Sequence, residues 1–148
     1  MRIEIDQSGK IEYTNKNTVL AFSNGIQKGI LFRSKNKRKI QKVFVGANRP
    51  EIFVYKLFAI LLYLLIKDDL GKIQSVVVDI EYTGKENLIK TFLKRILIKS
   101  NNKFETSSIS FRQVGRKSRC HKMAIEVYRR RRKASKEISL GEVMKYVL

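Results

Sequence analysis

The chain has 148 residues, of which 43% are hydrophobic and 30% are charged, so we expect one folded domain, residues 1–148, and not a disordered chain. A single cysteine excludes an internal disulfide, and Cys120 with His121 is too small a ligand set for a zinc finger. The 32 Lys and Arg against 13 Asp and Glu give a formal net charge of +19, which favours nucleic acid as the partner and an anionic membrane surface second.

The first segment, Met1–Gly9, alternates the apolar residues Ile3 and Ile5 with polar ones, and this period of two predicts a strand with one face in the core. Asp6 ends the alternation, and a turn composition follows it. The end of a central strand is a usual place for a metal ligand in an open α/β sheet. For this segment alone, an exposed aspartate on the polar face is the simpler interpretation.

The next segments predict an antiparallel meander. Thr18–Ser23 has the composition of a strand, Asn24–Gly25 is a hairpin signal, and Gly29–Arg33 is typical of the returning strand. Residues Lys35–Lys39 are expected to form a basic loop, with Ile40–Val45 as an extension of the meander.

A helix is predicted next, over residues 50–67, because Pro50 and Glu51 suit a first turn. Its residues Ile52–Ile66 are apolar except for Lys56, a run too short to cross a membrane. A helix that is apolar nearly all round must be covered on both sides, by the sheet and by either a second helix or another subunit, and we therefore hypothesise a homodimer through helix 50–67. The chain enters a strand at once, without a signal or transit peptide, so we expect an intracellular, cytoplasmic protein.

The second half alternates strands with helices. Ser75–Tyr82 contains the unbroken run Val76–Val78, which is typical of a strand buried on both faces, and Asp79 stands where that run stops. The remaining predicted elements are a helix over Glu86–Ile98, a strand over Ser107–Val114, a helix from Arg119 to about Lys133, and a short capped helix over Leu140–Leu148. The pattern predicts an α/β fold with a mixed five-stranded sheet, antiparallel at first and then parallel, with helices on both faces.

Three carboxylates are expected to meet in this fold. Asp6 and Asp79 end neighbouring parallel strands at the same edge, and the helix after the meander can bring Glu51 to that edge. Crowded carboxylates repel one another unless they share cations, so the group predicts a site for Mg²⁺ or Mn²⁺. Two such ions beside a phosphodiester can activate water and stabilise the leaving oxygen.

Four segments resemble the ribonuclease H-like superfamily of nucleases, which includes ribonuclease H and Holliday-junction resolvases. They are I-E-I-D-Q-S-G at 3–9, N-R-P-E at 48–51, V-V-V-D-I-E-Y at 76–82 and V-G-R-K-S-R-C-H-K-M-A at 114–124. The element order is similar along almost the whole chain. The resemblance implies a ribonuclease H-like fold in which Asp6, Glu51 and Asp79 are metal-binding and catalytic.

The chain departs from the family pattern at its fourth acidic position, which is His121 here. Imidazole can bind a transition metal or handle a proton, and some junction-resolving relatives carry a histidine near this place. The departure favours DNA, single-stranded or branched, over RNA–DNA hybrid as substrate. Lys117 or Arg119 could hold the scissile phosphate where the family often has a loop histidine. Glu81, two residues past Asp79 and on the same strand face, is a rival ligand, and Glu126 is a reserve acid.

Other interpretations of these residues remain. A Cys120–His121 thiol dyad is disfavoured because neighbours on a helix point about 100° apart. His121 can also be an ordinary residue at a helix start. The basic side chains expected to bind nucleic acid are Lys37, Arg38, Lys39, Arg116, Lys117, Arg119 and Lys122. The leading hypothesis is a metal-dependent nuclease, followed by ribonuclease H activity and by a catalytically inactive nucleic-acid-binding module, with a membrane-surface protein as the third class.

Overall fold

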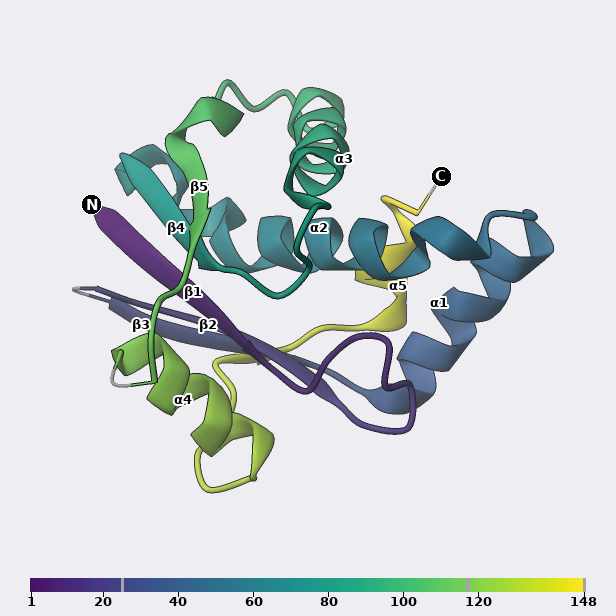
Figure 1. The fold of residues 1–148 in the computed structure, drawn as a ribbon, viewed down its shortest axis with the longest axis horizontal. Helices are drawn as coiled ribbons and strands as arrows, with labels where there is room; N and C mark the ends of the chain where they lie inside the picture. The colour runs from purple at the N-terminus through teal and green to yellow at the C-terminus, as the bar shows by residue number, and fades with distance from the viewer. Residues whose placement is uncertain (25, 117, 148) are drawn as a thin grey trace.

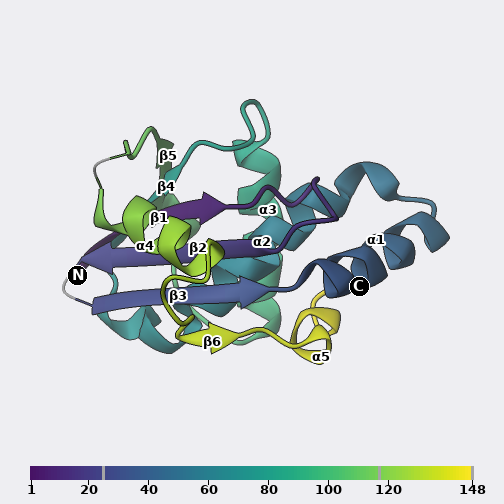
Figure 2. The same cartoon turned by 90° about the horizontal axis from the view of Figure 1, so that it is seen from below.

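The sheet has six strands, and a computed structural model describes it together with the rest of residues 1–24, 26–116 and 118–147 (Figures 1 and 2). The strand order is β5-β4-β1-β2-β3-β6, with β2 antiparallel to both of its neighbours and the other pairs parallel. The predicted mixed α/β sheet is confirmed, whereas the expected count of five strands is wrong by one short edge strand. The strands are β1 (Arg2–Ser8), β2 (Thr18–Asn24), β3 (Ile26–Phe32), β4 (Ser75–Asp79), β5 (Ile109–Arg112) and β6 (Lys136–Glu137).

The period of two in β1 divides its side chains between the two faces of the sheet. Ile3 and Ile5 are buried on the face that carries most of the helices, and Ile5 is opposite Val78 of β4. In the hairpin, Asn24 is opposite Ile26, as the turn signal predicted, and Gly25 lies outside the described residues. The meander therefore begins as expected.

Helix α1 (Ser34–Gly46) replaces the basic loop and the extra strand that were predicted for this segment. Its buried residues, Lys37, Ile40 and Phe44, are spaced three and four apart, which is the period of a helix face. One member of that face is a lysine, so counting only apolar residues hid the pattern. The correction matters for the site because α1 carries the chain away from the end of β3.

Helix α2 (Phe53–Ile66) forms the centre of the core. The short helix η1 (Pro50–Ile52) precedes it and η2 (Lys67–Lys72) follows it. Figure 1 shows α2 between the sheet and α3 (Glu86–Lys99), and it also contacts α1 and α5 (Leu140–Met144). Because elements of the same chain cover α2, the argument for a homodimer through this helix no longer holds. Of the helices that the structure describes, none has the length and apolar character needed to cross a bilayer.

Helix α4 (Arg119–Tyr128) covers the opposite face of the sheet (Figure 2). It buries Met123, Ala124 and Val127 against Val19 and Ala21 of β2. Helices therefore lie on both faces, as predicted, but α4 contacts β1, β2 and β3 and leaves β4 and β5 open on its side. For this reason Val77 is only half-buried, and the expectation that the Val76–Val78 run is buried on both faces is wrong.

The chain after α4 differs from the sequence prediction. The helix ends at Tyr128, well before Lys133, because Arg130 adopts a left-handed φ of 60° that turns the chain back toward the sheet. Ser135 then donates its backbone N–H to the Gly29 carbonyl of β3 at 2.8 Å, and β6 follows. The predicted capping box of the last helix is confirmed, with Ser139 and Glu142 as its members.

Candidate metal centre

The acidic side chains Asp6, Asp79 and Glu81 form a cluster at one edge of the sheet. Each offers a carboxylate oxygen, and the three oxygens all lie within 4.8 Å of one another. The parallel register of β1 and β4, with Ile5 opposite Val78, places Asp6 and Asp79 at the same strand ends. Glu81 joins them from the segment that follows β4, two residues after the strand ends at Asp79. The predicted meeting of Asp6 and Asp79 is confirmed.

A cavity of about 370 Å³ opens over this cluster. Its wall includes the three carboxylates, and Gln113, Gly115 and Arg116 form the segment that leads from β5 to α4. His121 completes the wall from the first turn of α4. The site therefore draws on β1, β4, the segment after β5 and α4, which are far apart in sequence.

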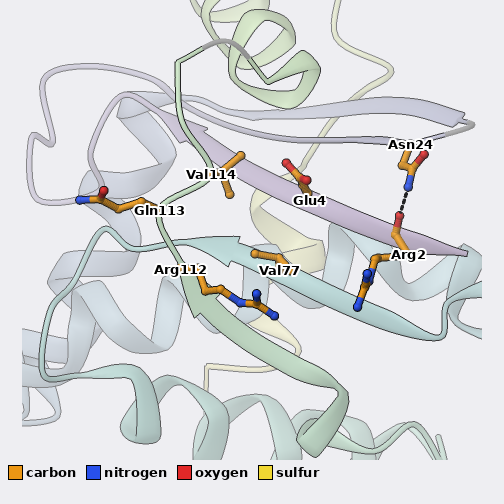
Figure 3. A pocket seen from close by; sticks show the side chains of 7 residues that line it. All are labelled: Arg2, Glu4, Asn24, Val77, Arg112, Gln113 and Val114. Carbon is orange, nitrogen blue, oxygen red and sulfur yellow. Dashed lines mark hydrogen bonds between the residues drawn. The ribbon is translucent and has the colours of Figure 1, made fainter.

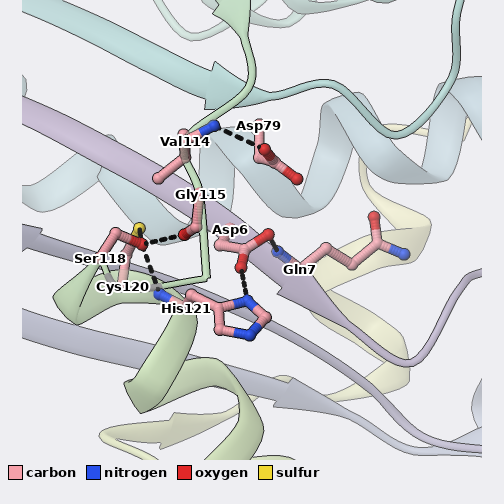
Figure 4. A network of polar contacts seen from close by, with 8 residues as sticks. All are labelled: Asp6, Gln7, Asp79, Val114, Gly115, Ser118, Cys120 and His121. Atoms are coloured by element: carbon pink, nitrogen blue, oxygen red, sulfur yellow. Dashed lines mark hydrogen bonds and ion pairs between the residues drawn. The ribbon is translucent and has the colours of Figure 1, made fainter.

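Hydrogen bonds hold two of the carboxylates in place (Figure 4). Asp6, which is only 4% exposed, accepts the backbone N–H of Gln7 at 2.8 Å and contacts His121 Nδ1 at 2.6 Å. Asp79 accepts the backbone N–H of Val114 at 2.8 Å. His121 is itself fixed where α4 begins, since its backbone N–H donates to the Ser118 hydroxyl at 3.2 Å. Asp79 also shares a side-chain hydrogen bond with Glu81, and both carboxyl groups line the cavity.

Burial and mutual repulsion change the acidity of the cluster. Burial, followed by the charges of Asp6 and Asp79, raises the pKa of Glu81 to about 8. Burial also raises the pKa of Asp6, although the hydrogen bond from His121 opposes this shift. Without a cation, the cluster therefore retains a proton near neutral pH. A divalent ion would replace that proton, and three carboxylates are the hard oxygen donors that Mg²⁺ and Mn²⁺ prefer.

His121 bonds to a carboxylate of the cluster through Nδ1, so this nitrogen is engaged with Asp6. A histidine placed in this way orients the carboxylate and stabilises its charged form. The roles of fourth metal ligand and proton handler stay predictions for His121. Its contact with Asp6 adds a third role, the orientation of that carboxylate.

Glu51 is not part of this cluster. It lies in η1, its side chain is 66% exposed, and its only ion-pair neighbour among the described residues is Arg49, at 4.0 Å. Figure 1 shows the junction of α1 and α2, where η1 lies, at the right-hand end of the molecule. The prediction that Glu51 reaches the acidic edge is wrong because α1 intervenes between β3 and α2. Glu81, the rival named from its spacing, takes the third place in the cluster.

Lys37 cannot bind nucleic acid, because it is fully buried. Its ammonium donates hydrogen bonds to the carbonyls of Lys10 and Tyr13 at 3.1 and 2.9 Å and to the Thr18 hydroxyl at 2.9 Å. The sequence expectation for this lysine is therefore wrong. A helical face containing Ile40 and Phe44 was the signal that could have revealed it.

The other predicted basic residues lie in two places. Arg38 and Lys39 are exposed on α1, where Arg38 donates to the Thr14 carbonyl at 2.9 Å. Arg116 lines the cavity, and Arg119 and Lys122 are exposed on the first turn of α4 beside it. Lys117 lies outside the described residues.

A shallow groove of about 240 Å³ lies next to the cavity, on the part of the sheet that α4 leaves open (Figure 3). The two hollows share Gln113. Arg2 of β1 and Arg112 of β5 contribute positive charge to the groove, and Glu4 contributes one acid. The sequence analysis missed this groove, although the polar positions that alternate with Ile3 and Ile5 were a signal for it.

The thiol of Cys120 takes no part in the cavity. It is buried, contacts the Ser118 hydroxyl at 3.3 Å, and burial raises its pKa to about 11. A thiol with such a pKa is a poor nucleophile at neutral pH, which removes the Cys120–His121 dyad.

Comparisons with known proteins do not identify a family for the chain: no family model, curated protein or solved structure matches it.

Proposed function

We propose that this chain is a divalent-metal-dependent nuclease of the ribonuclease H-like type, in which Asp6, Asp79 and Glu81 hold Mg²⁺ or Mn²⁺. The observation that carries the proposal is the convergence of three carboxylates, within 4.8 Å of one another, on an open cavity in a chain of net charge +19. Positive charge elsewhere on the chain would attract a polyanion, and the acidic cluster gives that polyanion a chemical centre.

Each residue of the site has a part in this proposal. The three carboxylates would bind one or two divalent ions, which supply water activation and stabilisation of the leaving oxygen when bound. His121 fixes the orientation of Asp6 and opposes the rise of its pKa. Arg116, on the cavity wall, is placed to contact a phosphate that enters the cavity.

The surroundings of the cavity support a strand of nucleic acid as substrate. The groove of Figure 3 continues from the cavity through Gln113, and Arg2 and Arg112 border it. An open groove accepts a polymer that extends beyond the reacting phosphate. The histidine at the fourth position of the resemblance favours DNA, single-stranded or branched, over RNA–DNA hybrid.

The test is a cleavage assay with labelled single-stranded DNA, junction DNA and RNA–DNA hybrid, each with Mg²⁺ and Mn²⁺ in turn. We expect metal-dependent cleavage that Asp6→Asn, Asp79→Asn or Glu81→Gln abolishes. Glu51→Gln is the matched control, because it removes one carboxylate from outside the cluster and should leave cleavage intact.

Mn²⁺ binding by calorimetry gives a second readout for the same variants. Wild-type protein and Glu51→Gln should bind the ion, and Glu81→Gln should bind it more weakly. Salt-sensitive retention of DNA without cleavage under either metal would refute the nuclease and leave a binding module.

A further inference from the structure

A third hollow, of about 400 Å³, lies where the chain turns after α4. Arg130, Arg131, Arg132 and Lys133 line it from the turn, and Arg33 lines it from the end of β3. Asn17, Leu31 and Ala134 complete the wall, so no acidic side chain is among its described lining residues. We call this feature the basic hollow. Five cations around one concavity repel one another, and an anion seated there would relieve that repulsion.

Part of this charge already has acidic partners outside the hollow. Arg33 pairs with Glu137, and Arg132 contacts Glu126 at 3.8 Å. Among the described ion pairs, none involves Arg130, Arg131 or Lys133, and all three side chains are exposed. These three cations are therefore available to a ligand.

The basic hollow lies on the same side of the sheet as the acidic cluster. The first turn of α4 carries His121, which contacts Asp6 of the cluster, and the turn after α4 lines the hollow. The 10 residues of the helix span about 15 Å. A second connection is shorter. Gly9 follows Asp6 by three residues, and a Cβ added to Gly9 would lie 2.6 Å from the Tyr128 ring and 2.0 Å from the carbonyl of Asn17, a residue of the hollow. The two sites are thus separated by about 10–15 Å.

We propose that the basic hollow binds backbone phosphates of the same nucleic-acid strand whose reacting phosphate lies at the acidic cluster. This proposal rests on the proposed function and adds the path of the strand over the protein surface, from the acidic cluster along α4 to the turn at Arg130–Lys133. Stacked nucleotides advance about 3.4 Å per residue along one strand, so the separation corresponds to about three to five nucleotides. Strands shorter than this reach one site but not both.

The test compares two double variants that remove the same charge. Arg131→Gln/Lys133→Gln changes the basic hollow, and Lys94→Gln/Lys103→Gln removes two exposed lysines in and after α3, on the other face of the sheet. Binding of a fluorescent 12-nucleotide and a 2-nucleotide single-stranded DNA is measured by anisotropy with EDTA present, from 50 to 200 mM NaCl. Because metal is absent, the measurement does not depend on cleavage.

We expect the hollow variant to bind the 12-nucleotide strand with a salt slope smaller by about 1.4, since each phosphate contact on a single strand contributes about 0.7. If both proteins bind equally at 1 M salt, the variant should bind the 12-nucleotide strand about 25-fold more weakly than the wild type at 0.1 M salt. The hollow variant should bind the 2-nucleotide strand, and the α3 control variant should bind both strands, within about twofold of the wild type.

Three results would overturn the proposal. Equal losses for the two double variants would show a general charge effect, and equal losses for the two strand lengths would show that the hollow does not extend the strand's path. Competition by millimolar inorganic phosphate as effective as that by the 12-nucleotide strand would assign the hollow to a free anion. Failure of the nuclease itself is seen separately, as absence of metal-dependent cleavage in the wild type.

Discussion

Replacing Lys37 with methionine should destabilise the fold, although the change removes only one of 32 basic residues. The ammonium is fully buried, and each of its three hydrogen bonds has an acceptor within 3.1 Å. Methionine has a similar length and volume, so the main loss is hydrogen bonding and not packing.

The magnitude follows from what each acceptor keeps. The carbonyl of Lys10 still accepts from the backbone N–H of Tyr13, that of Tyr13 from Lys16, and the Thr18 hydroxyl still donates to the Gly9 carbonyl. Each acceptor is therefore partly satisfied, and a loss near the low end for an unmet bond, about 1 kcal/mol each, gives about 3 kcal/mol in total. Lys39→Met, an exposed position on the same helix, should change stability by less than about 0.5 kcal/mol.

Urea unfolding monitored by circular dichroism measures both variants. Burial lowers the pKa of Lys37 from its usual 10.5 to about 8, so between these values the unfolded chain binds more protons than the folded one. Wild-type stability should therefore gain a contribution as pH rises from about 8 to 10.5, and Lys37→Met should lack it. Equal stabilities for Lys37→Met and Lys39→Met would refute the assignment of Lys37 to the core.

Three other outcomes are expected. Because the folded-state pKa of Glu81 is raised to about 8, the metal-free protein should lose stability as pH rises from about 4.5 to 8. A pH series of thermal melts should show this loss, and both saturating Mn²⁺ and Glu81→Gln should remove it. His121→Ala should weaken Mn²⁺ affinity by about 10–100-fold in calorimetry, since Asp6 loses the partner at 2.6 Å that orients it, and unchanged affinity would contradict that role. Met123→Ala should cost about 2–4 kcal/mol in urea unfolding, because this side chain, 2% exposed, fills the space between α4 and Gly29; a cost below about 1 kcal/mol would mean that α4 is not anchored there.

The strands and two of the three members of the acidic cluster, Asp6 and Asp79, could be predicted from the sequence pattern. A period of two fixes which face each residue of β1 occupies, and parallel pairing of β1 with β4 then places Asp6 beside Asp79. The first step uses a few neighbouring residues, and the second uses the order of strands and helices along the chain. Glu81 was named as a rival from its two-residue spacing, and it does join the cluster, although β4 ends at Asp79 and Glu81 lies in the segment after it.

The position of Glu51 could not be predicted in this way, because it depends on the path of about fifteen preceding residues. That path depended on Lys37, whose ammonium fixes the inner face of α1 through hydrogen bonds to two carbonyls before β2 and to Thr18, the first residue of β2. A buried, fully paired lysine has the same sequence signature as an exposed one. The turn at Arg130 was hidden for a related reason, since four consecutive arginines are compatible with either a helix or a loop.

Helix α4 joins two features that would otherwise be independent. Its first turn carries His121 against Asp6, and the turn after its last residue carries the arginines of the basic hollow. The helix rests on a small separate cluster centred on Met123 and Val127, not on the main core around α2. Because one helix carries both ends, a substitution that loosens the packing of Met123 or Val127 would disturb the His121–Asp6 contact and the basic hollow together.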